Sequence, residues 1–109
     1  MKIEFEKMEE AFLPEFKGGV GRLCTKMITD ENGKIMRGRL EPGCTIGLHT
    51  HDTSSEMIYI ISGTANYICD GEEEVVTAGN AHYCPKGHSH TMINKGTEDI
   101  IFFAVVPEQ

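Results

Sequence analysis

The sequence predicts an all-β domain in which many short strands close into a barrel or stack as two sheets. Turn-forming pairs and triplets rich in Gly, Pro, Asn and Asp recur at short intervals along the chain. The segments between them have the length of strands and are rich in β-branched and aromatic residues. Such a chain must cover its open strand edges and apolar faces, which closure or stacking achieves.

The first expected element is one short N-terminal helix. Phe5, Met8, Glu9 and Phe12 would share a helical face, and Pro14 limits this helix to two turns at most. No other segment predicts a helix. Strands are expected at residues 22–29, 34–40, 44–51, 56–61, 64–69, 72–76, 81–84, 88–93 and 98–106.

Two turns mark hairpins. Asn32-Gly33 and Asp70-Gly71 supply residue types that accept the positive φ angles of tight two-residue turns, so each is expected to join antiparallel neighbours. After the second turn, the acidic run Glu72–Glu74 is interpreted as a solvated strand edge.

Length and composition set further bounds. The chain has 109 residues, which predicts a single domain over residues 1–109. No apolar run approaches the roughly 20 residues needed to cross a bilayer, and the N-terminus lacks the pattern of a secretory signal, so a cytoplasmic location is expected. The net charge of -7 and the lack of a basic stripe argue against nucleic acid as a partner.

The four cysteines are Cys24, Cys44, Cys69 and Cys84, and none of them forms the closely spaced pairs typical of structural zinc sites. We expect reduced thiols that act as small buried hydrophobic residues. The segment Gly18–Gly21 lacks the Gly-Lys-Ser/Thr step of a phosphate-binding loop and is interpreted as a flexible turn.

The segment around His49 is the most informative for chemistry. His49 and His51 are two residues apart in an expected strand, so both imidazoles point to the same face. Glu56 follows a short loop and begins the next expected strand, where hairpin pairing would return its carboxylate to the same region. These three side chains predict a metal-chelating site.

Two more histidines, His88 and His90, follow the tight turn at residues 85–87. They are also two residues apart and would share a strand face, and either could complete the site. Three imidazoles and one carboxylate suit one divalent ion of iron, manganese, nickel, copper or zinc. Ligand type alone does not select among these metals.

Two spacings in this region resemble the two motifs of the cupin superfamily. The first spans residues 43–63 and contains Gly43, His49, His51, Glu56 and Gly63. The second spans residues 79–94 and contains Gly79, Pro85, Gly87, His90 and Asn94. Every specified position fits, so the sequence resembles a small, single-domain cupin.

The resemblance implies a double-stranded β-helix, which is a jelly-roll-type barrel. It also implies that His49, His51 and Glu56 are metal ligands and that His90, rather than His88, is the fourth. His88 then lies either at the pocket mouth or in a solvated turn. His82 is either a base behind the metal or a hydrogen-bonded core residue, and together with Tyr67 and His88 it is a candidate for catalysis.

Alternation of side chains along the strands predicts the wall of the pocket. The expected wall residues are Thr45, Ile58, Ile60, Tyr67, His82 and Phe102.

Four protein ligands leave open positions on a five- or six-coordinate metal, as a catalytic site requires. The first functional hypothesis is therefore a small-molecule metalloenzyme, and the resemblance implies an isomerase, lyase or dioxygenase acting on a sugar, keto acid or similar metabolite. The alternative is a noncatalytic module that binds or senses a small ligand, because no clear acid/base pair or nucleophile motif is present. The third hypothesis is a structural or storage barrel without metal. A homodimer is expected, since association would cover exposed sheet edges.

Overall fold

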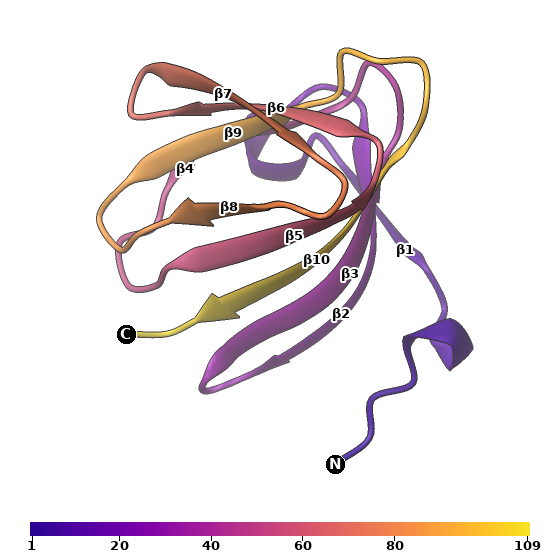
Figure 1. Ribbon diagram of the computed structural model, residues 1–109. Coiled ribbons are helices and arrows are strands. Elements are labelled where there is room, and N and C mark those ends of the chain that lie inside the picture. The colour runs from indigo at the N-terminus through magenta and orange to yellow at the C-terminus, as the bar shows by residue number, and fades with distance from the viewer.

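The computed structural model describes residues 1–109 as two antiparallel sheets that face each other (Figure 1). The elements are, in order, η1 (Phe5–Lys7), β1 (Ala11–Pro14), η2 (Phe16–Gly18), β2 (Arg22–Asp30), β3 (Gly33–Leu40), β4 (Thr45–Thr50), β5 (Glu56–Ser62), β6 (Thr64–Cys69), β7 (Glu72–Thr77), β8 (Ala81–Cys84), β9 (Ser89–Ile93) and β10 (Ile100–Pro107), where η marks a 3-10 helix. The predicted all-β class is confirmed. Each of the nine expected strands is present with small shifts at its ends.

The chain alternates between the two sheets. The first sheet has six strands in the order β1-β2-β3-β10-β5-β8, and the second has four in the order β4-β9-β6-β7. From β3 onward, every connection crosses to the other sheet, apart from the β6–β7 hairpin. Residues far apart in sequence therefore meet between the sheets, which is where the predicted ligands lie.

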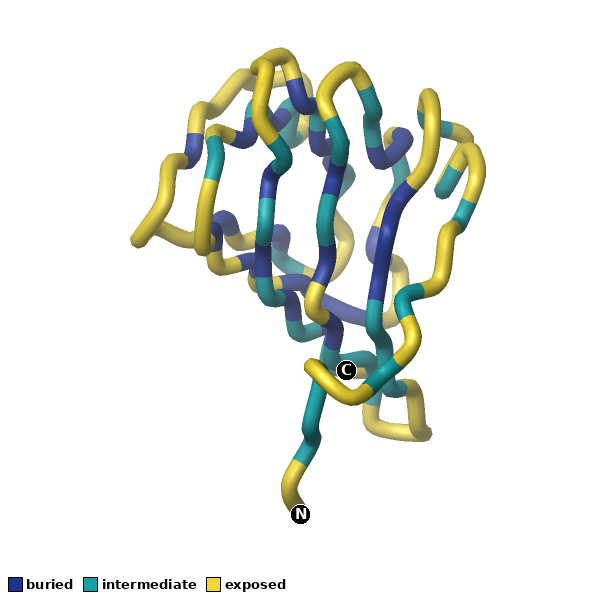
Figure 2. Tube along the Cα trace, turned by 90° about the vertical axis from the view of Figure 1, so that its right-hand side faces the viewer, coloured by how far each residue is buried: buried dark blue, intermediate teal, exposed yellow.

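The core fills the space between the sheets. Burial alternates along the central strands, most regularly in β10, because successive side chains point to opposite faces of a sheet (Figure 2). Large side chains without any exposure include Leu23, Leu40, Ile60 and Ile100, while Phe102 is 1% exposed. Phe102 lies against Gly38, where an added Cβ would come within 2.2 Å of the ring.

The N-terminal segment differs from the expectation. The predicted helix over residues 5–12 is reduced to the 3-10 turn η1, and residues 11–14 form β1 instead. Pairing with β2 explains this, since Phe12 lies opposite Cys24 in the strand pair, whereas an isolated helix of two turns would be only marginally stable in water. In Figure 1 the residues before β1 extend away from both sheets.

A second 3-10 turn, η2, was not expected. Glu15 and Lys17 both adopt left-handed backbone conformations, with φ of 49° and 55°. The turn is pressed against β4: an added Cβ on Gly47 would lie 2.0 Å from the Lys17 carbonyl oxygen, and one on Gly19 would lie 2.1 Å from that of Thr45. Two glycines therefore permit this close backbone contact.

Both predicted hairpins are present, but one turn is placed differently. Asp70 and Gly71 have φ of 50° and 82°, as the tight turn between β6 and β7 requires. Between β2 and β3, Asp30 pairs with Gly33, so the two turn residues are Glu31 and Asn32 rather than Asn32 and Gly33. The Asn32 amide donates to the Asp30 carboxylate at 2.8 Å, which stabilises the turn.

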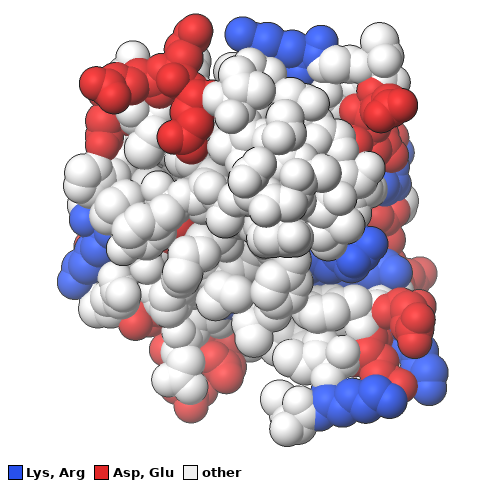
Figure 3. All heavy atoms as spheres, viewed as in Figure 1, with Lys and Arg blue, Asp and Glu red and all other residues white.

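The outer face of the six-stranded sheet exposes apolar side chains on β5 and β8. Met57, Tyr59, Ile61 and Tyr83 are 42%, 49%, 39% and 57% exposed. Figure 3 shows a broad region over these strands without charged side chains, with Lys, Arg, Asp and Glu gathered around the rim. We call these four residues the β5–β8 apolar face.

The four cysteines are free thiols, as expected. The only helical elements are the two three-residue turns, and neither is long or apolar enough to span a membrane.

Candidate metal centre

His49 is held on β4 with one defined ring nitrogen free. Its Nδ1 lies 2.7 Å from the backbone carbonyl oxygen of Gly47. A carbonyl oxygen only accepts hydrogen bonds, so Nδ1 carries the proton and donates it. The Nε2 lone pair is therefore available to a metal, which is the usual arrangement for a ligating histidine.

The other three side chains reach the same point from both sheets. His90 on β9 is paired directly with His49 on β4, while Glu56 begins β5 in the opposite sheet. The predicted hairpin between the strands that carry His49 and Glu56 is wrong, because β4 and β5 belong to different sheets. Their side chains meet because the two sheets face each other. His51 follows β4, and its Nδ1 lies 2.9 Å from the Ser54 hydroxyl.

The spacing of the four donor atoms matches a metal coordination shell. His90 Nε2 lies 3.0 Å from Glu56 Oε1, 3.0 Å from His51 Nε2 and 3.2 Å from His49 Nε2. Glu56 Oε1 lies 3.3 Å from His51 Nε2, and all four donor atoms lie within 4.8 Å of one another. Two ligands about 2.1 Å from a metal and at right angles to each other are separated by about 3.0 Å, so these distances fit one ion.

The protonation states of Glu56 and His49 also favour binding of a cation. Burial opposes ionisation of Glu56, but its contacts with His51 and His90 outweigh burial and lower its pKa to about 2. Burial lowers the pKa of His49, and the neighbouring His90 and His51 act in the same direction. An ionised carboxylate and the Nε2 lone pair of His49 are thus directed at one site, where a cation would neutralise their repulsion.

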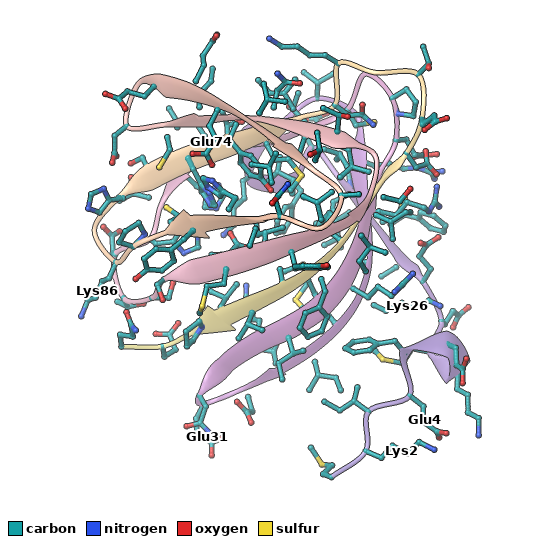
Figure 4. The ribbon with its side chains drawn as sticks, in the orientation of Figure 1. Lys2, Glu4, Lys26, Glu31, Glu74 and Lys86 are labelled. Atoms are coloured by element: carbon teal, nitrogen blue, oxygen red, sulfur yellow. The ribbon has the colours of Figure 1, made fainter.

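Behind His90 lies a second buried histidine. His82 Nε2 lies 3.0 Å from His90 Nδ1, and His82 Nδ1 lies 2.7 Å from Glu74 Oε1. Glu74 accepts the His82 Nδ1 proton, so His82 Nε2 accepts the Nδ1 proton of His90 and leaves His90 Nε2 free toward the donor cluster. Glu74 is labelled on β7 of the four-stranded sheet in Figure 4.

Tyr67 supports this arrangement from the side. Its ring stacks on His82 with 3.8 Å between centroids, and both side chains are 1% exposed. Burial raises the pKa of Tyr67 well above its usual value, with the charges of Glu56 and Glu74 adding to the effect. The Tyr67 hydroxyl has no hydrogen-bond partner. Tyr67 therefore packs as a neutral ring.

His88 lies elsewhere. Its side chain is 48% exposed and forms a close pair with the Asp70 carboxylate on the surface. Asp70 also accepts a hydrogen bond from the Ser89 amide at 3.1 Å. Hydrogen bonding to His88 and then to Ser89 lowers the pKa of Asp70. The structure thus brings His90, and not His88, to the four-residue cluster.

A cavity of about 350 Å³ opens in front of the four donor side chains. Its lining is mixed, and the apolar residues in it include Leu23, Met36, Ile46, Ile58, Met92 and Phe102. Of the expected wall residues, Ile58 and Phe102 line it, whereas Thr45, Ile60, Tyr67 and His82 do not. Exposed polar residues, among them Lys17, Asp52 and Glu108, border its mouth.

Sequence reasoning missed three contributors to the site. Glu74 lies on an edge strand and its side chain is 51% exposed, as expected for a solvated edge, but its carboxylate also contacts His82, and alternation with the buried Val76 was the signal for this contact. The other two are Ser54, whose hydroxyl contacts His51, and Phe16, which belongs to the unexpected turn η2 and lines the cavity. Only Glu74 had a usable signal in the sequence.

Comparison with known proteins identifies the family. The model of the cupin domain family matches residues 36–106. The chain belongs to the cupin family. This cupin is 34% identical over 112 residues to a Thermotoga maritima protein named an oxalate-binding protein, with 97% of this chain and 93% of the relative covered.

Solved cupin structures share its fold. A crystal structure from Thermotoga maritima, described as a predicted oxalate decarboxylase, superposes with a TM-score of 0.93 at 24% identity and full coverage of both chains. The cupin domain of Cnp3 from Schizosaccharomyces pombe gives a TM-score of 0.81 at 9% identity, covering 100% of this chain and 74% of that chain. A cupin domain of an XRE family transcriptional regulator from Enterobacter cloacae gives 0.71 at 19% identity, covering 80% and 97%. The expected double-stranded β-helix is confirmed.

Proposed function

We propose that this cupin binds one divalent transition metal ion through His49, His51, Glu56 and His90, and that it holds a small organic acid at the ion. The convergence of these four donor atoms within 4.8 Å is the observation that carries the proposal. Three imidazoles and one carboxylate suit iron, manganese, nickel, copper and zinc.

The ligand class follows from the position of the cluster. The donor side chains line the cavity, so a bound ion would face it with open coordination positions. Such an ion supplies positive charge that attracts carboxylate and carbonyl oxygens. The name of the Thermotoga maritima relative, an oxalate-binding protein, supports a small acid as the ligand.

Binding without turnover is favoured by the residues around the cavity. Apart from the four donors, the titratable side chains of the lining are Lys17, Lys34, Asp52 and Glu108. The catalytic candidates Tyr67, His82 and His88 do not line the cavity. A general acid or base must reach the bound ligand directly or through one water. The chain therefore offers the ligand few groups for proton transfer.

A metalloenzyme is the second candidate, because an ion that faces an open cavity can act as a Lewis acid without a protein base. An isomerase, lyase or dioxygenase acting on a sugar or keto acid would use the site in this way. The description of the Thermotoga maritima structure as a predicted oxalate decarboxylase supports a lyase. Here His82 and Glu74 would orient His90, and Tyr67 would fix His82.

Metal content tests the proposal. Purified protein is incubated with each of the five metals, dialysed and analysed by plasma mass spectrometry, alongside His90→Ala and the surface control His88→Ala. We expect one ion per chain in the wild type and in His88→Ala, and strong loss in His90→Ala. Equal occupancy in all three proteins would refute the assignment of His90.

Titration of the loaded protein with pyruvate and oxalate then distinguishes ligand binding from turnover, since a bound ligand is recovered unchanged.

A further inference from the structure

One part of the cavity wall beside the four donors is apolar. Met36, Phe102 and Val106 come from β3 and β10 of the six-stranded sheet, and all three are buried. Ile58 lies on the same inward-facing row of β5 as Glu56, two residues further along. A ligand held at the donor cluster can therefore place an apolar substituent against this part of the wall.

The cavity is also larger than oxalate requires. A volume of 350 Å³ corresponds to about a dozen water molecules at about 30 Å³ each. Oxalate has only six non-hydrogen atoms and fills a small part of this space. Part of the remaining water would lie against the apolar side chains of the wall, and replacing that water by an apolar group is favourable.

Charge balance gives a second, independent argument. A divalent ion with three neutral imidazoles and the Glu56 carboxylate leaves one net positive charge. A singly charged acid neutralises it, whereas the oxalate dianion leaves one negative charge among apolar residues, which is costly. The lining contains two lysines, Lys17 and Lys34, and two further acidic residues, Asp52 and Glu108, so their charges add up to zero.

We infer that the ligand is a singly charged chelating acid, of the 2-oxo or 2-hydroxy class, that carries a branched apolar substituent. The carboxylate and the neighbouring oxygen face the donor cluster, and the substituent packs against Met36, Phe102 and Val106. This inference rests on the proposed function and adds the ligand class that the cavity selects.

A ligand series tests the inference by calorimetry on protein loaded with Mn²⁺ and, separately, with Zn²⁺. The series contains oxalate, pyruvate, 4-methyl-2-oxopentanoate and 2-hydroxy-4-methylpentanoate. Each buried carbon is expected to tighten binding about fourfold, so the branched 2-oxo acid, which has three more carbons, should bind up to about 60-fold more tightly than pyruvate. Metal content is measured after each titration, because oxalate can remove metal from the protein.

A pair of matched variants locates the substituent. Met36→Gln places a polar group of similar length on the cavity wall and should weaken binding of 4-methyl-2-oxopentanoate about 10-fold while leaving pyruvate unchanged. Met27→Gln is the control, since Met27 pairs with Met36 on the neighbouring strand and does not line the cavity. Thermal unfolding of both variants verifies that they fold.

The outcomes separate this inference from the proposed function. Affinity that rises with chain length, and a loss confined to Met36→Gln, support the inference. Affinity that is flat along the series, or tightest for oxalate, overturns the inference and leaves metal-dependent acid binding intact. Metal-loaded protein that binds none of the four acids overturns both.

Discussion

The contact between His82 and His90 leads to a quantitative prediction about metal affinity. Replacing His82 by Leu keeps a side chain of similar size but removes the acceptor for the His90 Nδ1 proton, which lies 3.0 Å away. His90 is 2% exposed, so water does not readily replace that partner. An unpaired buried donor costs about 1–3 kcal/mol, and loss of such a supporting residue typically lowers metal affinity by about 10- to 100-fold.

We therefore expect His82→Leu to weaken Zn²⁺ binding by about 10- to 100-fold. Glu74→Gln should have a smaller effect, of about a few-fold, because the amide oxygen still accepts the His82 proton but without its charge. The assay is competition with a chromogenic zinc chelator at neutral pH, with circular dichroism to verify the fold.

His88→Ala is the matched control, because it removes a histidine that is also paired with a carboxylate but on the surface. Its metal affinity should equal that of the wild type. Unchanged affinity in His82→Leu would show that His82 does not orient His90. An equal loss in His88→Ala would show that the effect of His82→Leu is not specific to the contact with His90.

Three further predictions concern pH, packing and association. Metal affinity should fall as the pH is lowered through the pKa of free histidine, about 6.5, because protons compete with the metal for the imidazoles. Burial lowers the pKa of His49, so His49 should be protonated only at lower pH, and Glu56, with a pKa of about 2, stays ionised throughout this range. Constant affinity between pH 8 and pH 5 in chelator competition would contradict this. Gly47→Ala should cost about 1–3 kcal/mol in urea unfolding, since its Cβ meets backbone, whereas Gly96→Ala, with 3.5 Å to its nearest neighbour, should cost little; equal stability of the two variants would argue against the close contact. The β5–β8 apolar face should form a homodimer interface, so light scattering should give a dimer for the wild type and a monomer for Tyr59→Lys, and a wild-type monomer would refute it.

The strands and two-sheet class were predictable because turn residues and side-chain alternation are local signals. The helix predicted from Phe5 to Phe12 was wrong because the spacing of apolar residues there also fits a helix. The strand forms because Phe12 pairs with Cys24 of β2, a contact that the local sequence does not show. The η2 turn depends on close contact with Gly47, which lies far along the chain. No local pattern encodes that contact.

The candidate site was predictable in its residues but not in its supporting contacts. His49, His51, Glu56 and His90 were selected by the resemblance to the cupin motifs, and the structure brings all four together. Pairing of β4 with β5 was the wrong reason to expect Glu56 there, since it arrives from the opposite sheet. The neighbours of His82 depend on packing between sheets.

Gly47 contacts both the N-terminal turn η2 and the ring of His49. Its Cα faces the Lys17 carbonyl oxygen, and its own carbonyl accepts the His49 ring proton at 2.7 Å. Gly47 thus allows the N-terminal turn to pack closely on β4 and sets the tautomer of one of the four clustered donor side chains. A substitution at Gly47 would therefore disturb the N-terminal turn and the orientation of the His49 imidazole together, although Gly47 has no side chain at the donor cluster.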